Sequence, residues 1–328
     1  MPIGSGSRRR SAEFSVRQFG TRLVQHGLVS LLRAVGAALR FVPWRWYHSV
    51  GWVLGQLWWQ ASPLRRHVTV ENLQRAFPER PRSWHTQVAR QCYTNAGIVL
   101  AEILSLAWLQ AEELEERVRF VNPELFAECA QRGRGLLLLS GHYGNWEWLA
   151  CAAGLALRRL GIPVTVIVQR QANAVADQWL NRYRTRWGNR TVELDHAAWA
   201  LARALQKREA VALLADQRAK PETALWLPFF GSAVPVHTMP AAVALRFRVP
   251  IILGFAFRQS DGRYVVPLEE LPSQDLPDTL EGVRELTWRY LQRLESVIRQ
   301  HPELWLWQHR RWKYVRPAAD VPSTATAP

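Results

Sequence analysis

Cysteine and lysine are scarce in this chain. Its 328 residues include only three cysteines, Cys92, Cys129 and Cys151, which stand far apart in the sequence. No pair has the short spacing of a zinc site, and an odd number does not suit a disulfide framework, so a reducing compartment fits best. Lysine also occurs only three times. The basic residues are therefore almost all arginines, a bias that a GC-rich genome explains and that carries no functional weight.

A long uncharged apolar run is also missing. The best stretch of spanning length, Trp46 to Leu64, contains a histidine, two glutamines and a proline. The apolar segment before it is interrupted by arginines and lacks a cleavage site, which argues against a signal peptide. We therefore expect the N-terminus to be retained and to lie on a membrane rather than across it.

Positive charge and tryptophan are abundant. The formal net charge is +15, and residues 1–66 supply ten arginines against the single acid Glu13. Such a balance indicates a polyanionic partner, which could be nucleic acid, anionic lipid or an acidic protein. The 17 tryptophans suit places where one end of the ring is apolar and the other is wet, such as membrane interfaces, although many should pack in the core.

The N-terminal region combines both features. From Phe14 to Phe41, apolar residues recur every three or four positions, with arginines on the other side, and a tryptophan-rich segment follows from Trp44. This pattern is typical of an amphipathic helix in the plane of a membrane with anionic head groups. A helix packed on the protein's own core is the alternative.

The rest of the chain predicts an α/β fold. Residues 67–119 should form helices broken near Phe77-Pro78 and Pro81. After Arg134, short apolar runs alternate with helical stretches, which indicates a mixed, mainly parallel central sheet flanked by helices. The expected strands are Leu136–Ser140, Val164–Val168, Val211–Ala215 and Ile251–Phe257, and Thr279–Gln300 should be a helix. We expect a basic tail (1–13), a membrane-associating helical region (14–66), a catalytic domain (67–316) and a second tail (317–328).

The strongest chemical signal is a buried strand that runs into a glycine-flanked histidine. Residues 136–148 read LLLLSGHYGNWEW, so His142 follows the strand and stands between Gly141 and Gly144. Ligands of open α/β sheets bind beyond the carboxyl ends of the strands, and glycines allow a substrate to approach closely. His142 is therefore the candidate general base.

Glu147 lies five residues after His142, in the first turn of the next helix. From there its carboxylate could hydrogen-bond the imidazole, fix its tautomer and stabilise the imidazolium. No serine or cysteine forms a nucleophile elbow here, so we expect direct attack by a substrate hydroxyl without an acyl-enzyme. A histidine and glutamate at this spacing also occur by chance, and a satisfied core histidine is the alternative.

Five blocks follow one another along the chain: Glu71–Pro78, Ser140–Glu147, Asp216-Gln217, Pro228–Gly231 and Pro302–Lys313. In these blocks and their order the chain resembles the lipid A biosynthesis lauroyl and myristoyl acyltransferases, the late acyltransferases, within a lysophospholipid acyltransferase-like superfamily. The resemblance implies a glycerol-3-phosphate acyltransferase-like fold and transfer of a fatty acyl chain from acyl carrier protein, or coenzyme A, to a hydroxyl of a lipid A precursor. It implies catalysis by His142 and Glu147, with no metal or cofactor.

The resemblance also implies further site residues and a location. Arg170 and Arg184 are candidates to hold phosphate or the oxyanion, and Arg182 and Arg186 could do so in place of Arg184; a solvated helix face is the alternative for these last three. Asp216 could orient an arginine or cap a turn, and Asn145, beside the histidine, is a further candidate substrate-binding residue. The expected place is the cytoplasmic face of the inner membrane, with peripheral or monotopic attachment through the N-terminal region. The apolar Leu225–Gly231 segment is a candidate wall of the acyl groove, and an ordinary core loop is the alternative. Arg310, Arg311 and Lys313 could face acidic carrier protein or head groups, or lie beside the core.

Two other functions compete with this interpretation. A nucleic-acid-binding protein would explain the pI near 10.8, but the charge lies in an apolar amphipathic segment and no nucleic-acid module is recognisable, so we expect no nucleic acid partner. An acyltransferase of the same fold that uses another glycolipid or a lysophospholipid would share the His142 motif. The blocks at Glu71–Pro78 and Pro302–Lys313 favour the lipid A branch.

Overall fold

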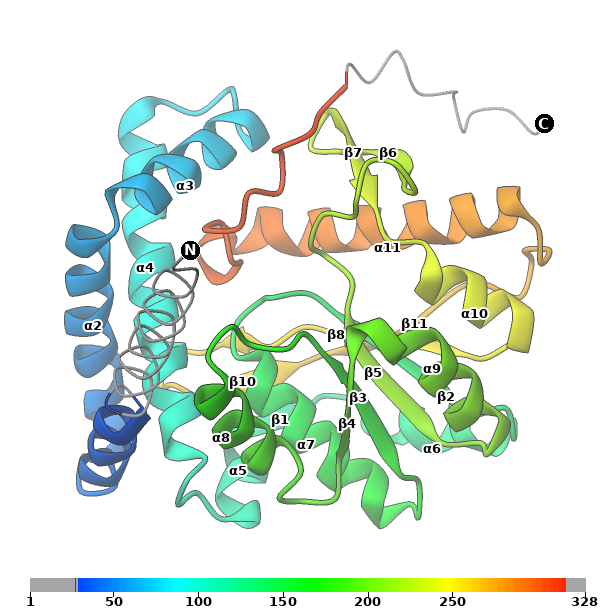
Figure 1. Cartoon of the computed structure of the whole chain (residues 1–328), viewed down its shortest axis with the longest axis horizontal. Helices are drawn as coiled ribbons and strands as arrows, with labels where there is room; N and C mark the ends of the chain where they lie inside the picture. Colours follow the sequence, from blue (N-terminus) through cyan, green and yellow to red (C-terminus); the bar gives the residue numbers. More distant parts are fainter. Residues whose placement is uncertain (1–26, 28, 317–328) are drawn as a thin grey trace, which may run out of the picture.

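A six-stranded sheet forms the centre of the molecule (Figure 1). The computed structural model describes residue 27 and residues 29–316. The strand order is β11-β8-β2-β5-β3-β4, and all neighbours are parallel except the edge pair β11 and β8. The strands are β2 (Leu136–Ser140), β3 (Val164–Val168), β4 (Arg190–Glu193), β5 (Ala210–Leu214), β8 (Ile251–Gly254) and β11 (Leu268–Leu271).

Helices cover both faces of this sheet, as its buried strands require. Leu137 and Leu139 of β2 point to one core, with helices α9, α10 and α11, whereas Leu136 and Leu138 point to the other core, with α6 and α7. This alternation follows from the two-residue period of a strand. The helices are α6 (Glu124–Gln131), α7 (Trp146–Arg159), α8 (Ala174–Arg184), α9 (Ala197–Gln206), α10 (Met239–Phe247) and α11 (Leu280–Gln300).

Three helices before the sheet form a separate layer beside it, seen at the left of Figure 1. They are α2 (Tyr47–Ala61), α3 (Pro63–Ala76) and α4 (Arg82–Ser105), followed by the short α5 (Ala111–Arg117). Helix α2 packs on α4 through glycines: a Cβ atom on Gly51 would lie 2.5 Å from Cα of Ile98, and one on Gly97 would lie 2.1 Å from the carbonyl oxygen of Gly51. Only glycine permits so close a crossing.

Two smaller sheets and three short 3₁₀ helices complete the described fold. Strands β1 (Val118–Phe120), β10 (Tyr264–Val266) and β9 (Phe257–Arg258) form one sheet, and the hairpin of β6 (Leu225–Phe229) and β7 (Ser232–Val236) forms the other. The 3₁₀ helices are η1 (Trp44–Trp46), η2 (Leu194–His196) and η3 (Pro302–Leu304). The last of these leads into a segment whose Trp305, Trp307 and Trp312 pack in the core beside the hairpin.

The predicted mixed, mainly parallel α/β architecture is confirmed. The strand expected over Ile251–Phe257 is divided into β8 and β9, and the expected helix Thr279–Gln300 is α11, with Thr279 as its N-cap. The two terminal tails and residues 14–26 of the expected amphipathic helix lie outside the described residues. Within residue 27 and residues 29–316, no helix is both long and apolar enough to cross a membrane.

The described part of the N-terminal region packs on the protein itself. Residues 29–39 are helical, and Val29 and Leu39 are buried with Leu104 of α4 in a small core. For these residues, the apolar side of the helix packs on the protein's own core, which was the alternative to membrane contact. Exposed apolar side chains remain at Leu31 and Phe41, so the segment is not buried on every side.

Candidate functional site

His142 lies just beyond the carboxyl end of β2, where the sequence predicts it. Strands β2 and β5 are parallel and in register, with Ser140 opposite Leu214. Two residues further along each chain, His142 and Asp216 meet. The backbone of His142 is fixed from the other side as well, because its carbonyl accepts a hydrogen bond of 3.0 Å from the N–H of Leu306.

Asp216 is the hydrogen-bond partner of the His142 ring. Its Oδ1 lies 2.8 Å from Nδ1 of His142, and its Oδ2 accepts from the backbone N–H of His142 at 2.9 Å and from the Trp305 indole at 2.8 Å. Burial alone would raise the pKa of Asp216, but the charge and hydrogen bonds of His142 and the Trp305 donor outweigh it and lower the pKa to about 2. A carboxylate can only accept, so the proton of the neutral ring lies on Nδ1.

Nε2 of the imidazole is left as the basic nitrogen. It lies 3.3 Å from the side-chain nitrogen of Gln217, which can donate to it, and Trp146 packs edge-on against the ring at 5.0 Å between centroids. The His142 side chain is 19% exposed. The ring is thus fixed at Nδ1 but reachable at its edge, which suits a general base.

Glu147 does not hydrogen-bond His142, so that expectation is wrong. Both of its carboxylate oxygens are taken by Arg184: Nε lies 2.8 Å from Oε2, and Nη2 lies 2.5 Å from Oε1. Arg184 also donates to the side chain of Asn181 at 3.0 Å. Burial opposes the charge of Arg184, but its contacts with Glu147 dominate and raise its pKa. Because Glu147 begins α7 and points toward α8, it forms a fork-shaped ion pair beside the histidine instead of orienting it.

The turn after His142 depends on Gly144. Its φ is +57°, and a Cβ atom there would lie 1.9 Å from the carbonyl oxygen of Ala256. Its N–H donates to the carbonyl of Leu304 at 2.9 Å. This tight, left-handed turn brings the chain from His142 directly into α7.

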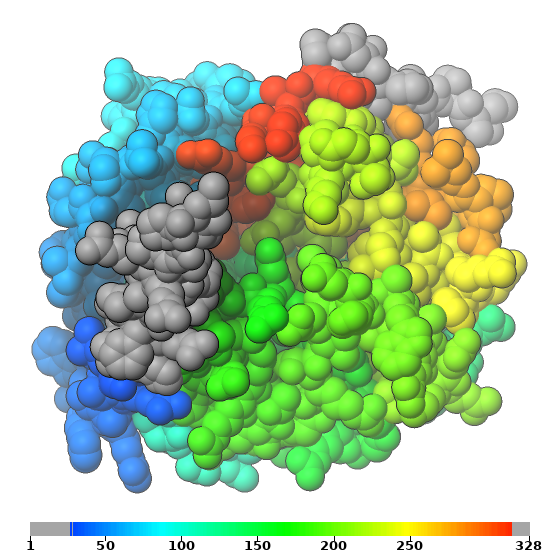
Figure 2. All heavy atoms as spheres, viewed as in Figure 1, coloured from blue at the N-terminus to red at the C-terminus, as the bar shows by residue number. Residues whose placement is uncertain are grey.

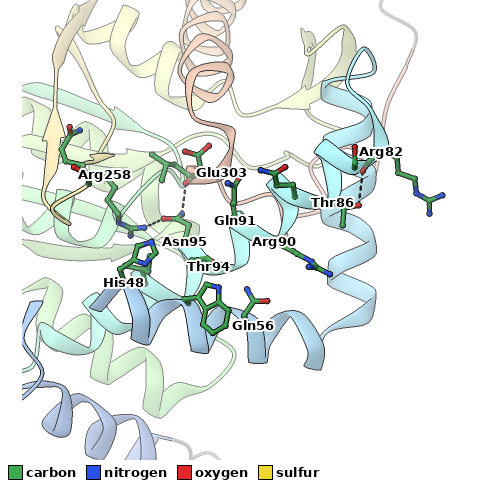
Figure 3. Close-up of a pocket in the computed structure, with 17 residues that line it drawn as sticks. His48, Gln56, Arg82, Thr86, Arg90, Gln91, Thr94, Asn95, Arg258 and Glu303 are labelled. Carbon is green, nitrogen blue, oxygen red and sulfur yellow. Dashed lines mark hydrogen bonds between the residues drawn. The ribbon is translucent and has the colours of Figure 1, made fainter. Parts of the chain in front are cut away.

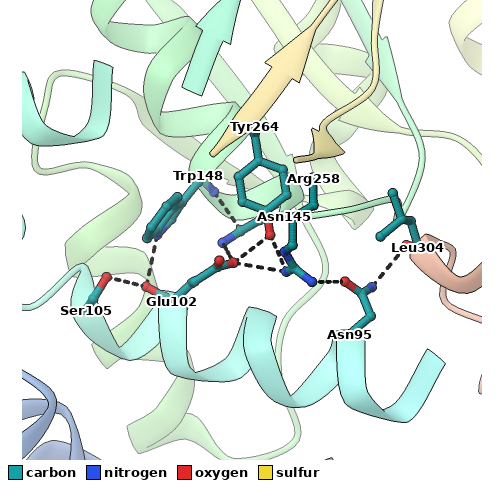
Figure 4. A network of polar contacts seen from close by, with 8 residues as sticks. All are labelled: Asn95, Glu102, Ser105, Asn145, Trp148, Arg258, Tyr264 and Leu304. Atoms are coloured by element: carbon teal, nitrogen blue, oxygen red, sulfur yellow. Dashed lines mark hydrogen bonds and ion pairs between the residues drawn. The ribbon is translucent and has the colours of Figure 1, made fainter. Parts of the chain in front are cut away.

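The side chain of Asn145 packs behind this turn and cannot contact a substrate. The side chain is fully buried; its oxygen accepts from the N–H of Trp148 and caps α7, and its nitrogen donates to Glu102 at 2.9 Å (Figure 4). Glu102 also receives the Tyr264 hydroxyl at 2.7 Å and pairs with Arg258. The predicted substrate-binding role of Asn145 is therefore wrong, because the buried network uses both polar atoms of its carboxamide.

A cavity of about 1010 Å³ opens beside His142. Figure 2 shows a hollow on this face between the green segments and the red C-terminal segment. Polar residues line one part of the cavity: His142, Glu147, Arg184, Gln217, His237 and His309. Apolar residues of the α6 and α7 side of the sheet line another: Phe126, Leu138, Ala153, Val166, Ala212 and Ile252. A ligand with a reactive polar end and a long apolar part fits this division.

Two of these lining residues, His237 and His309, were missed by sequence reasoning. Burial, together with nearby positive charge, lowers the pKa of both, to about 4 for His309, so both are neutral at physiological pH. His309 stands in the Pro302–Lys313 block, but that block did not indicate a place in the site, and His237 stands in none of the blocks; the fold brings both to the cavity. For Gln217 a signal did exist, because it follows Asp216 directly at the end of β5.

The other predicted basic residues are scattered. Arg170 is exposed, and although Gln169 and Gln171 line the cavity, Arg170 itself does not. Arg182 is exposed outside the cavity lining, and Arg186 donates to backbone carbonyls of Leu106 and Leu109. Among these four arginines, only Arg184 lines the cavity.

One candidate surface belongs to the core, and a second is divided between the core and the surface. The Leu225–Gly231 segment does not line the cavity, because Leu227, Phe229 and Phe230 are buried against the C-terminal tryptophans. The proposed acyl-groove wall at this place is therefore wrong. Arg311 is 1% exposed and donates to the carbonyl of Pro235, whereas Arg310 and Lys313 are exposed.

The fold and the site together define an α/β enzyme with a carboxylate-oriented histidine at a strand end. In the part of the chain that the structure describes, no group of three His, Cys, Asp or Glu side chains could hold a metal ion. The model of the bacterial lipid A biosynthesis acyltransferase family matches residues 17–314, so the chain belongs to this family and is an acyltransferase.

Two curated proteins are similar over most of their length. A lipid A biosynthesis acyltransferase of Haemophilus influenzae is 22% identical over 82% of each chain. A lipid A biosynthesis lauroyltransferase of Escherichia coli is 23% identical over 86% of this chain and 89% of its own. The match to the family model extends over both the helical layer and the sheet that carries His142.

Proposed function

We propose that this acyltransferase transfers a fatty acyl chain from an acyl carrier protein or coenzyme A thioester to a hydroxyl of a lipid A precursor. The observation that carries the proposal is the position of His142, whose ring is held by Asp216 at the edge of a cavity that is polar near the histidine and apolar elsewhere. The family and the names of the two relatives support lipid A chemistry over another glycolipid or a lysophospholipid acceptor.

His142 acts as the general base. The acceptor oxygen attacks the thioester carbonyl carbon while Nε2 takes the hydroxyl proton, and Asp216 stabilises the resulting imidazolium through Nδ1. The thiolate then leaves and receives that proton. The donor acyl group therefore passes directly to the acceptor, without an acyl-enzyme. Ser140 supports this route, because its hydroxyl donates to the carbonyl of Gly141 and hydrogen-bonds no basic side chain among the residues that the structure describes.

Glu147 and Arg184 hold the substrate end of the cavity in shape. In this proposal the N–H groups of Arg184 that Glu147 does not use contact a phosphate or the developing oxyanion, for which a guanidinium is well suited. Glu147 keeps this cation in place and neutralises it between turnovers. Glu147 is thus a positioning residue for Arg184, while the acyl chain lies along the apolar part of the cavity.

The proposed location is the cytoplasmic face of the inner membrane, with peripheral attachment through the N-terminal region. The ten arginines of residues 1–66 complement anionic head groups, and an acidic carrier protein would meet the exposed Arg310 and Lys313. Mass spectrometry of lipid A from a deletion strain tests the acceptor. Lipid A that lacks one acyl chain is the expected result, and an unchanged lipid A with altered phospholipids or other glycolipids would favour the alternative acceptor.

A further inference from the structure

A second hollow, separate from the catalytic cavity, lies between α2, α4 and the turn after β9 (Figure 3). Its volume is about 1300 Å³, and it shares no lining residue with the cavity of His142. Leu304 lines this groove, whereas Leu306 lines the catalytic cavity. The proposed acyl transfer assigns no role to the groove.

The groove is lined mainly by neutral hydrogen-bonding groups. Amide side chains come from Gln56, Gln87 and Gln91, and hydroxyls come from Thr86 and Thr94. Such groups can both donate to phosphate oxygens and exchange hydrogen bonds with ligand hydroxyls. Gln87, Gln91 and Thr94 follow one face of α4 at intervals of four and three residues, so this helix presents them as a row, and Gln56 faces them from α2.

Arginines give the same groove an unbalanced positive charge. Arg82 and Arg90 line it, and neither forms an ion pair with any carboxylate in residue 27 and residues 29–316. Arg66 and Arg90 both stack on the Trp59 ring, with their guanidinium carbons 5.2 Å and 5.7 Å from its centroid. A third cation therefore lies close to Arg90 and adds to the positive field on this side of the groove.

Two other charged residues line the groove. Arg258 is neutralised by Glu102 in the buried network, and Glu303 is the one carboxylate among the lining residues, against the two arginines Arg82 and Arg90. Glu303 contributes to the groove near Asn95, more than one turn of α4 beyond Arg90. The excess charge of the groove is therefore positive and lies toward Arg82 and Arg90.

The groove adjoins an exposed apolar face of α2. Trp52 lines the groove and is 53% exposed, and the next positions around the helix include Val53 and Leu57, which are 48% and 62% exposed. The stripe of Gly51 and Gly55 faces α4 instead. Exposed apolar side chains beside basic groups are typical of a surface that enters the head-group region of a membrane.

We infer that this groove binds the head group of an anionic phospholipid. The phosphate lies by Arg90, within the positive field of Arg66 and Arg82, and the head-group hydroxyls contact the amide row on α4. Trp52 and Leu57 enter the boundary between head groups and acyl chains. The inference rests on the proposed location at a membrane surface, and is independent of the chemistry of His142.

The test measures co-sedimentation of the full chain with phosphatidylcholine vesicles, with and without phosphatidylglycerol. The variant Arg82→Gln/Arg90→Gln is compared with Arg203→Gln/Lys207→Gln, which removes the same charge from exposed positions at α9. Each basic residue near an anionic surface contributes about a factor of five, so the groove variant should bind phosphatidylglycerol vesicles about twenty-five-fold more weakly than the wild type. The control variant also keeps the basic N-terminus, and its binding to these vesicles should weaken much less.

A second pair tests the apolar face. Trp52→Ala should weaken vesicle binding, whereas Trp199→Ala, at a still more exposed tryptophan on α9, should not. If soluble glycerol phosphate competes with vesicle binding, the phosphate group itself is the ligand. If binding depends on the two arginines but glycerol phosphate does not compete, the phosphates recognised are those of the charged membrane surface. Equal binding by the two arginine variants, or equal binding of wild type to both kinds of vesicle, would overturn the inference.

Activity separates this inference from the proposed function. With donor and acceptor dispersed in detergent, the groove variants should transfer acyl chains as the wild type does, because none of the changed residues lines the catalytic cavity. His142→Ala should show the opposite result, with normal vesicle binding and no transfer. Failure of the membrane inference would therefore leave the proposal for His142 intact.

Discussion

Nδ1 of His142 lies 2.8 Å from Oδ1 of Asp216, two residues beyond the paired strand positions Ser140 and Leu214. Parallel register brings the two side chains to the same sheet edge, and the buried carboxylate then fixes the ring. Trp305, from the C-terminal segment, donates to the other carboxylate oxygen. Three distant parts of the sequence thus hold one imidazole in place.

Asp216→Asn should lower turnover by about 10²-fold or more, because the amide cannot stabilise the imidazolium and can favour the wrong tautomer. Asp278→Asn is a suitable control, since Asp278 is exposed and pairs with Arg246 on another part of the surface. Steady-state kinetics on the folded variants provide the comparison. Turnover of Asp216→Asn equal to that of the control would remove Asp216 from the mechanism.

The lowered pKa of Asp216 also predicts a pH dependence of stability. A carboxyl group whose folded pKa lies below its unfolded value of about 3.9 stabilises the protein above that pH, and this contribution disappears as the pH falls toward 2. Urea unfolding should therefore show the largest advantage of wild type over Asp216→Asn near neutrality and a smaller one near pH 3. A stability advantage of wild type over Asp216→Asn that grows as the pH falls would contradict this prediction.

Glu147→Ala should reduce both stability and transfer. Removal of one partner leaves Arg184 buried without its counter-charge, which typically costs about 3–5 kcal/mol. Replacing both members by apolar residues, in Glu147→Leu/Arg184→Met, should recover much of the stability. Transfer should remain low in this double variant if Arg184 contacts substrate. Recovered turnover together with recovered thermal stability would mean that the pair is only structural.

Gly144→Ala should destabilise the protein and disable the site, because the new Cβ would meet the carbonyl of Ala256 in a left-handed backbone. Gly133→Ala is a matched control: Gly133 has a φ of +67°, but nothing lies within 4 Å of a Cβ there. The control should lose about 1 kcal/mol from backbone strain alone. Thermal unfolding of the two variants measures the difference, and equal losses would argue against a steric requirement at Gly144.

The sequence predicted the strands and the position of His142 because local patterns determine both. Apolar runs of strand length define β2 and β3, and the glycine-flanked histidine marks the end of β2. It did not predict the partner of His142, because that depends on which strands are neighbours. Asp216 is 74 residues from His142 in the chain, whereas Glu147 is close in sequence and far better placed for Arg184.

The assignment of Asn145 failed for a related reason. Proximity to a catalytic residue in the sequence says little about the direction of a side chain at a helix start, where an asparagine commonly caps the helix. Its buried partner Glu102 lies on α4, a helix that sequence analysis places before the catalytic motif without indicating where it packs. The same is true of His237 and His309, which only tertiary folding brings to the cavity.

Acyl transfer by purified His142→Ala is the most direct test of the central claim. The enzyme is incubated with an acyl thioester and a lipid A precursor, and the acceptor is followed by mass spectrometry for the gain of one acyl group. Loss of the base should reduce the rate by about 10²–10⁴-fold, while thermal unfolding and vesicle binding remain close to those of the wild type. Near-wild-type turnover by the well-folded variant would contradict the assignment of His142 as the general base.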